Sequence, residues 1–164
     1  MKHTAAIIVA SDKGYAGERK DESGQVIESI LRDNGYEVKA PVILPDERDV
    51  LADKMREYCN ECINLVITTG GTGFSKRDVT PEATLDVIDR EAPGIPQAIL
   101  NYSLSITPRA MLTRMKAGIK DDTLIVNLPG SPKAVREDLE FILPSLKHGL
   151  EILLGQDSEC AAKE

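Results

Sequence analysis

"NLVITTGGTGFSKRDVTPEAT", residues 64–84, contains the transition that decides the fold. An apolar strand, Asn64–Thr69, runs directly into a glycine-rich loop, and a helix start follows. We expect Thr80 to cap that helix, with Pro81 at its first position and Glu82 near the positive end of its dipole. A buried strand that passes through a polar loop into a helix is typical of a parallel α/β protein.

The same alternation of strands and helices extends along the chain in both directions. The other expected strands are 4–10, 36–44 with an edge or a bend at Pro41, and 123–128. The other expected helices are 23–34, 48–60, one around 95–102, one from 131 that Pro144 ends or kinks, and a final one through 154. The segment 111–119 is ambiguous and could add a short antiparallel edge. This order predicts an α/β three-layer sandwich, a mainly parallel sheet covered by helices on both faces. We expect one domain over residues 1–154 and a polar tail over 155–164.

The bulk composition excludes several classes of function. The 164 residues suit one globular domain, and 41% of them are hydrophobic, so an aliphatic core can form. A net charge of −7 argues against a nucleic-acid or membrane binder, because such surfaces need an excess of basic residues. No apolar run reaches the length of a membrane span, and the N-terminal apolar run is too short for a signal peptide, so we expect a cytoplasmic protein.

The three cysteines, an odd number, suggest reduced thiols. Cys59 and Cys62 form a C-x-x-C at the end of an expected helix, where the helix dipole would oppose thiolate formation. A zinc site would need further ligands, and Cys160, His3 and His148 are all remote in the sequence. We therefore expect neither a metal nor a redox role for this pair.

Four polar loops follow the four expected strands. They are residues 11–24, 45–47, 70–78 and 129–133. Right-handed crossovers bring the carboxyl ends of parallel strands to one edge of the sheet, where α/β proteins bind ligands. We therefore expect Asp12, Asp46, Gly71, Asp78 and Ser131 to line one cleft at that edge.

The glycine loop and the loop after the last strand are each open to two interpretations. Gly70, Gly71 and Gly73 would let backbone N–H groups approach a phosphate. The loop lacks the ending of a P-loop and the last glycine of a Rossmann motif, however, so it could equally be a tight turn. "PGSPK", residues 129–133, places Ser131 at a helix N-cap, which suits a phosphate site or an ordinary helix start.

Asp78 stands in the glycine loop, where its carboxylate would repel a bound phosphate. The conflict disappears if Mg²⁺ lies between them, because Mg²⁺ prefers carboxylate and phosphate oxygens. Asp46 ends the neighbouring loop and could be the second carboxylate. In the plainer interpretation, Asp46 is a turn residue and Asp78 a favourable charge near a helix N-terminus. Two such acids beside two phosphate-type loops favour magnesium–nucleotide chemistry.

Several stretches of the chain resemble one known family, in order and in register. They are "SD…AG…D.SG" (11–24), "LPDE" (44–47), "TTGGTGFSKRDVTPEAT" (68–84), "ITPRAMLTR" (106–114) with "AGI" (117–119), and "NLPGSPKAV" (127–135). The chain resembles the MoaB/Mog domain of molybdenum cofactor biosynthesis from about Thr4 to Leu154, and most closely its molybdopterin adenylyltransferases. "GGTGFSKRDVTPEAT" is a highly specific motif of that family.

The resemblance implies a homotrimer that transfers AMP from ATP to molybdopterin, with Mg²⁺ and release of pyrophosphate. It also points to the molybdate-inserting enzyme of the same pathway as a partner. Asp46 and Asp78 match the family's essential aspartates and are the expected catalytic and metal-binding residues. The expected nucleotide-binding residues are Gly70, Gly71, Thr72, Gly73, Pro129, Gly130 and Ser131, and the expected substrate-binding residues are Ser11, Asp12, Ser103 and Thr113. Thr113 stands where serine is more usual in the family, which keeps a donor but adds a methyl group.

Two rival interpretations of a different class stay open. One is a pterin-binding or scaffold paralogue without catalysis. The other is a nucleotide hydrolase resembling the competence-damage-inducible proteins, which share the fold. The retained sequence "DVTP", residues 78–81, favours the active type, because some inactive paralogues alter it.

Overall fold

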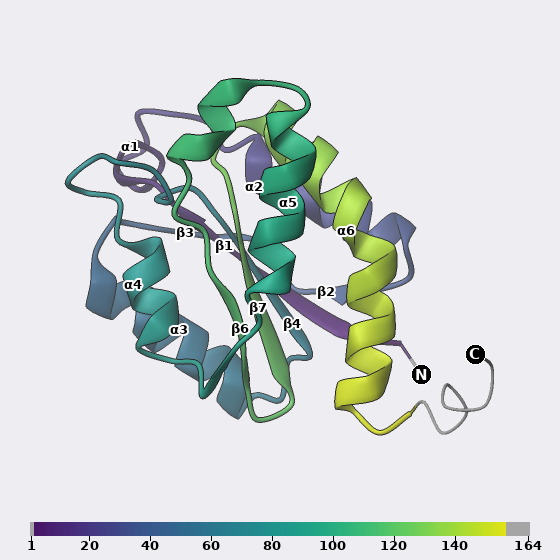
Figure 1. The fold of residues 1–164 in the computed structure, drawn as a ribbon. Helices are drawn as coiled ribbons and strands as arrows, with labels where there is room; N and C mark the ends of the chain where they lie inside the picture. Colours follow the sequence, from purple (N-terminus) through teal and green to yellow (C-terminus); the bar gives the residue numbers. More distant parts are fainter. Residues whose placement is uncertain (1, 157–164) are drawn as a thin grey trace.

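The structure, a computed structural model, describes residues 2–156, and within them seven strands form one central sheet (Figure 1). The strands are β1 Thr4–Ala10, β2 Glu37–Val38, β3 Val42–Leu44, β4 Leu65–Thr69, β5 Arg90–Glu91, β6 Ala117–Lys120 and β7 Thr123–Leu128. β1 pairs in parallel with β2 and β3 on one side and with β4 on the other, and β4 pairs in parallel with β7. β6 is antiparallel to both β7 and β5. The sheet is therefore mainly parallel, as expected.

Helices cover both faces of the sheet, which gives the predicted three-layer sandwich (Figure 1). They are α1 Asp12–Tyr15, α2 Ser23–Asp33, α3 Arg48–Asn60, α4 Thr80–Leu85, α5 Gly94–Leu104, the 3-10 helix η1 Pro108–Leu112, and α6 Pro132–Leu153. α2, α5 and α6 pack on one face, and α3 and α4 on the other. Successive strand residues point to opposite faces, so Ile7 of β1 joins one apolar cluster and Ile8 joins the other.

The order of the strands creates a switch point beside β1. From β1 the chain passes through α2 to β2 and β3 on one side, and then through α3 to β4 on the other side. The loops at the carboxyl ends of β1 and β4 therefore diverge, and ligands of open α/β sheets bind in the crevice between such loops. Because β1, β3, β4 and β7 are parallel, the polar segments that follow them begin at this one edge.

The expected strand 36–44 is divided in two. β2 ends at Val38 and β3 begins at Val42, with Pro41 between them, and both halves pair with β1. Pro41 has no N–H to donate to a sheet ladder, so the pairing stops before it and resumes after it. The bend expected at Pro41 is present as this break.

Pro144 was expected to end or to kink the last helix, and the first of these two expectations is wrong. α6 is a single helix from Pro132 to Leu153. Pro144 is exposed, whereas its neighbours Leu143 and Leu146 are buried against the sheet. The carbonyl of Glu140 loses its helical partner at Pro144, and Glu140 is exposed, so water can replace the missing N–H. Packing of the leucines keeps the helix continuous.

The expected cap of α4 is also wrong. Val79 occupies the N-cap position and makes no side-chain cap bond, and Thr80 is the first helical residue. The Thr80 hydroxyl donates instead to the carbonyl oxygen of Gly70 at 3.0 Å. A contact with the glycine loop has taken the place of the local cap.

The ambiguous segment 111–119 supplies part of an antiparallel pair, although not the sheet edge. Its first residues belong to η1, and β6 begins only at Ala117. β6 lies between β7 and β5, so the short β5 forms the edge.

The described residues include two of the three cysteines. Cys59 is buried and Cys62 is exposed at the end of α3, while Cys160 lies outside residues 2–156, as does the expected polar tail from residue 157 onward. Burial raises the pKa of the Cys59 thiol, which disfavours its thiolate. No helix in this part of the chain is long and apolar enough to cross a membrane.

Candidate active site

One large cleft opens at the edge where β1, β3, β4 and β7 end. Its volume is about 820 Å³, within the roughly 300–1,000 Å³ typical of ligand sites. Its walls come from the loops after these strands and from the first turns of α2 and α6. The residues expected to share one cleft, Asp12, Asp46, Gly71, Asp78 and Ser131, all line it.

The glycine loop needs glycine at two positions for its own geometry. Gly70 and Gly71 have φ angles of 89° and 67°, in the left-handed region that favours glycine. A Cβ atom at Gly70 would overlap the carbonyl oxygen of Ala10, and one at Gly71 would overlap the Thr80 hydroxyl. The loop can therefore lie directly against the end of β1 only because these side chains are absent.

Two of the four N–H groups of residues 70–73 are already used within the protein. Gly70 donates to the carbonyl oxygen of Leu128 at 3.3 Å, and Gly73 donates to Asp78 Oδ2 at 3.1 Å. Gly71 and Thr72 have no acceptor for their N–H groups among the described residues. Gly71 lines the cleft, so a phosphate there could accept from its N–H group without breaking an existing bond, whereas Thr72 is buried and does not line the cleft.

The loop after β7 is fixed beside the glycine loop by two hydroxyl groups. Thr69 Oγ1 donates to the carbonyl oxygen of Pro129, and Ser23 Oγ donates to that of Gly130, both at 2.7 Å. Ser131 is the N-cap of α6, as expected, and its side chain accepts a helix N–H at 3.4 Å. The start of this 22-residue helix thus lies at the cleft, where its dipole favours an anion.

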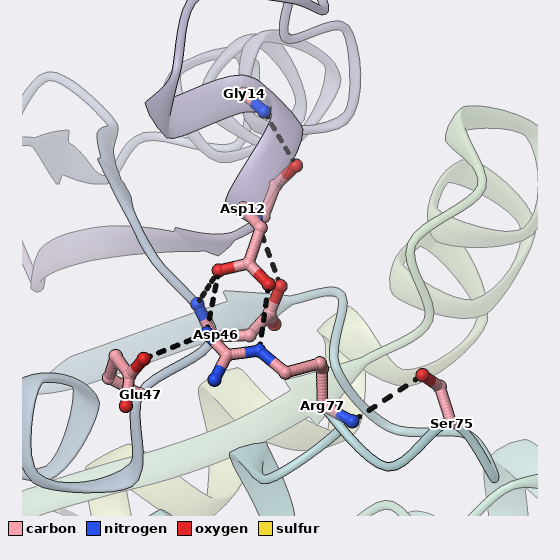
Figure 2. Close-up of polar contacts among 7 residues, drawn as sticks. Asp12, Gly14, Asp46, Glu47, Ser75 and Arg77 are labelled. Atoms are coloured by element: carbon pink, nitrogen blue, oxygen red, sulfur yellow. Dashed lines mark hydrogen bonds and ion pairs between the residues drawn. The ribbon is translucent and has the colours of Figure 1, made fainter.

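Asp12 and Asp46 are joined by a reciprocal pair of hydrogen bonds (Figure 2). The backbone N–H of Asp12 donates to Asp46 Oδ2, and the backbone N–H of Asp46 donates to Asp12 Oδ1, both at 2.9 Å. The exchange ties the loop after β1 to the loop after β3 and fixes the direction of both side chains.

The other carboxylate oxygen of Asp46, Oδ1, is buried and has no hydrogen-bond partner among the described residues. Burial, together with the negative charges of Asp12 and Asp78, raises the pKa of the Asp46 carboxyl above its usual value. A buried carboxylate oxygen without a partner is costly unless a cation or a donor reaches it. Mg²⁺ prefers oxygen ligands and would satisfy this atom, so the donor set fits that ion.

Asp78 closes the turn of the glycine loop with its own side chain. Its Oδ2 accepts hydrogen bonds from the N–H groups of Gly73 at 3.1 Å and Ser75 at 3.2 Å. Because both bonds use Oδ2, Oδ1 remains available to a ligand in the cleft. Within residues 2–156, no group of three or more His, Cys, Asp or Glu side chains could hold a metal ion by itself. A magnesium ion that also binds phosphate oxygens needs only one or two carboxylates.

Arg77 is a half-exposed residue of the cleft wall that contacts two acids (Figure 2). Its guanidinium donates twice to Asp12, at 3.0 Å in each bond, and once to Glu47 at 2.8 Å. The bonds from Arg77 and from the Asp46 backbone hold the pKa of the Asp12 carboxyl below its usual value. The sequence suggests Arg77, with Lys76 and Lys133, as a basic residue that could neutralise bound phosphates, whereas Glu47 is not among the expected site residues. The sequence signal for Glu47 was its position next to Asp46.

A second, smaller cavity lies next to the first along the turn that opens α6, where Pro129 and Ala134 line the smaller cavity and Gly130 and Ser131 line the larger one. The volume of the smaller cavity is about 240 Å³, and Ser103, Thr113 and Pro129 line it together with Asp138. The expected site residues are therefore divided between two cavities. Those that line neither cavity are Thr72 and Gly73. Asp138 is absent from the expected residues, because an acid in a surface helix usually faces solvent.

The fold and the cleft define an α/β protein with a ligand site at the switch point of its sheet, suited to a phosphate-bearing ligand and a divalent cation. A comparison with known families then identifies the family. The family model described as "Probable molybdopterin binding domain" matches residues 6–148, and the chain belongs to this family.

Individual relatives agree with that membership. Molybdopterin adenylyltransferase of Helicobacter pylori (strain J99) is 39% identical over 153 residues, which are 91% of this chain and 86% of the relative. Gephyrin of Dictyostelium discoideum is 40% identical over 157 residues, which are 90% of this chain and 22% of gephyrin. The crystal structure of the molybdopterin biosynthesis enzyme MoaB from Thermus thermophilus gives a TM-score of 0.88 at 42% identity, covering 93% of this chain and 97% of that one.

These findings confirm the expected resemblance to the MoaB/Mog domain and the α/β fold that it implies. The expected enzyme class, a nucleotidyltransferase, agrees with the name of the Helicobacter relative.

Proposed function

We propose that this protein is a molybdopterin adenylyltransferase of molybdenum cofactor biosynthesis. It transfers AMP from Mg-ATP to the terminal phosphate of molybdopterin and releases pyrophosphate. The relative of that name, 39% identical over most of both chains, supports the adenylyl transfer. The observation that best supports the magnesium–nucleotide part is the buried, unpartnered Oδ1 of Asp46 in the cleft.

Asp46 and Asp78 are the proposed catalytic and metal-binding residues. Mg²⁺ held by them would also bind phosphate oxygens and neutralise the charge that develops there during transfer. Asp12 positions Asp46 through the reciprocal hydrogen bonds, and Gly73 and Ser75 position Asp78.

The proposed nucleotide contacts are the glycine loop Gly70–Gly73 and the loop Pro129–Ser131. In the glycine loop the free N–H group of Gly71, which lines the cleft, is the one from which a phosphate oxygen could accept a hydrogen bond. Molybdopterin is assigned to the remaining expected residues, Ser11, Asp12, Ser103 and Thr113. The two cavities on either side of the turn at Pro129 give the second substrate room beside the first.

Adenylyl transfer needs no nucleophile from the protein. The terminal phosphate of molybdopterin attacks the α-phosphorus of ATP, and the bond from that phosphorus to the pyrophosphate oxygen breaks. The protein has to align two polyanions and to offset their charge. The free N–H group of Gly71, the start of α6 and Nη1 of Arg77, which makes no bond among the described residues, are available for this.

The proposal includes a homotrimer in the cytoplasm, where ATP is available, and the molybdate-inserting enzyme of the same pathway as a partner. Large apolar side chains are exposed on α5, η1 and α6, namely Leu104, Met111, Leu112 and Phe141. A trimer contact over this face would remove them from water.

Pyrophosphate release, measured with ATP and molybdopterin separately and together, tests this function. We expect release only when both substrates and Mg²⁺ are present. Release from ATP alone would indicate a nucleotide hydrolase. Binding of molybdopterin without any release would indicate a non-catalytic pterin-binding or scaffold protein.

A further inference from the structure

The smaller cavity contains a buried acid that the chemistry of adenylyl transfer does not use. Asp138 of α6 is only 2% exposed, and its Oδ1 accepts a hydrogen bond from Ser103 Oγ at 2.8 Å. No other group among residues 2–156 donates to this carboxyl, so Oδ2 keeps its full capacity to accept. Asp138 lines the cavity, where a ligand can reach it.

The walls around Asp138 do not offset its charge. Much of the lining is apolar, including Leu100, Ile106 and Met115. Arg109 also lines the cavity but forms no ion pair with Asp138 within the described part of the chain. Burying a carboxyl with an unpaired oxygen in apolar surroundings costs folding free energy. Such a group is typical of a binding site whose ligand supplies the missing hydrogen-bond donor.

The smaller cavity lies beside the main cleft along the segment 129–134. Pro129 and Ala134 line the smaller cavity, whereas Gly130 and Ser131, between them in sequence, line the larger one. A ligand with a ring in the smaller cavity could therefore place a phosphate at the start of α6. The volume of about 240 Å³ is below the roughly 300–1,000 Å³ of sites that enclose a whole drug-sized ligand. It suits one ring system.

We propose that Asp138 is a specificity-determining residue that recognises the pterin ring of the substrate through the adjacent 2-amino and N3–H groups. This inference rests on the proposed function, because molybdopterin supplies the ring. A carboxylate can accept two N–H groups from one flat edge, and Oδ1 can accept a second bond beside that from Ser103, since each oxygen has two lone pairs. Burial raises the pKa of Asp138 to about 6, so at pH 7.5 the carboxyl is ionised and accepts both bonds.

Two ligands that differ in one exocyclic group provide the test. They are 6-hydroxymethylpterin phosphate, with an amino group at C2, and the corresponding lumazine phosphate, with an oxygen there. Wild-type protein should bind the pterin at least about tenfold more tightly, because the lumazine oxygen would face a carboxylate and leave it unpaired. Asp138→Asn keeps an acceptor for Ser103 and should lose this preference. Glu137→Gln, an acid that lines the same cavity, is the matched control and should keep it.

Equal affinity of wild-type protein for the two ligands would overturn the inference, whatever the variant does. An unchanged preference in Asp138→Asn with an unchanged or higher melting temperature would overturn it as well. Pyrophosphate release by wild-type protein is measured in parallel. Its absence would reject the proposed adenylyl transfer, while the binding comparison would still decide the role of Asp138.

Discussion

Asp12 and Asp46 each accept a hydrogen bond from the backbone N–H of the other, at 2.9 Å in both directions. The exchange occupies Asp46 Oδ2 and leaves Oδ1 enclosed beside Gly71, where a Cβ atom would lie 3.1 Å from it. Asp46 cannot turn toward solvent without breaking this contact. Its buried charge can therefore be compensated only by a cation or a hydrogen-bond donor that enters the cleft.

Asp46→Asn separates the charge of Asp46 from its hydrogen bond to Asp12. The asparagine oxygen can still accept the Asp12 N–H, so the loops stay joined. The pKa of Asp46 is raised in the folded protein, so ionisation at neutral pH costs stability, and we expect an unchanged or higher melting temperature. Pyrophosphate release should fall by about two orders of magnitude or more, because charge stabilisation by a metal is worth several kcal/mol. Near-normal turnover would remove Asp46 from catalysis.

Gly71→Ala tests whether the glycine loop depends on its backbone geometry. The φ angle of 67° and the overlap of a Cβ atom with the Thr80 hydroxyl should lower the free energy of unfolding by about 1–3 kcal/mol. Gly149→Ala is the control, because a Cβ atom there meets nothing within 4 Å. In the interior of α6 this change should stabilise the protein by about 0.4–1 kcal/mol. Urea unfolding of both variants is the measurement, and equal effects would show that the loop relaxes freely.

The sequence predicted the sheet because its central strands are short apolar runs buried on both faces. It also predicted the meeting of the polar loops, since parallel strands place their carboxyl ends together. It could not supply the partners of single side chains. The exchange between Asp12 and Asp46 joins positions 34 residues apart, and the burial of Asp138 depends on how α6 lies against α5.

Predictions from local sequence signals were wrong where tertiary contacts determine the local structure. Thr80 has the sequence of a helix cap, yet its hydroxyl donates to Gly70 ten residues earlier. Pro144 is a helix breaker by its chemistry, yet Leu143 and Leu146 hold the helix against the sheet on both sides of it. In each case the stronger contact lies outside the segment that carries the signal.

Asp138→Asn should raise stability at neutral pH and lose that advantage in acid. The folded pKa of about 6 lies above the ordinary value of 3.8, mainly because of burial. The stability contributed by the protonated form is therefore fully present below about pH 3.8 and is lost as the pH rises through about 6. At pH 7.5 the ionised carboxylate costs about 2–3 kcal/mol, which asparagine avoids. Urea unfolding at pH 7.5 and pH 4 measures this, and the same effect at both values would contradict it.

The exposed apolar face of α5, η1 and α6 should mediate self-association. Sedimentation at micromolar concentration should give three times the 17.9 kDa chain mass. Leu112→Glu places a charge on this face and should shift the protein to monomer. Leu85→Glu places the same charge on an exposed leucine of α4, which covers the other face of the sheet, and should leave the trimer intact. A wild-type monomer would reject the trimer.

Asp78→Asn distinguishes a structural role of the glycine-loop acid from a catalytic one. The asparagine oxygen can still accept the N–H groups of Gly73 and Ser75, so the turn should persist, and only the charge is lost. If that charge only favoured the dipole of α4, its loss would cost about 0.3–1 kcal/mol and leave turnover nearly intact. If Asp78 holds Mg²⁺ against the triphosphate, pyrophosphate release should fall by orders of magnitude while the melting temperature changes little. We expect the second result, with molybdopterin binding in the absence of ATP changed much less than turnover.

Asp49→Asn is the matched control, because Asp49 is an exposed acid in the first turn of α3 outside the cleft. Its loss should leave turnover normal. Near-normal pyrophosphate release by Asp78→Asn at limiting Mg²⁺ would show that Asp78 has only a structural role in the loop.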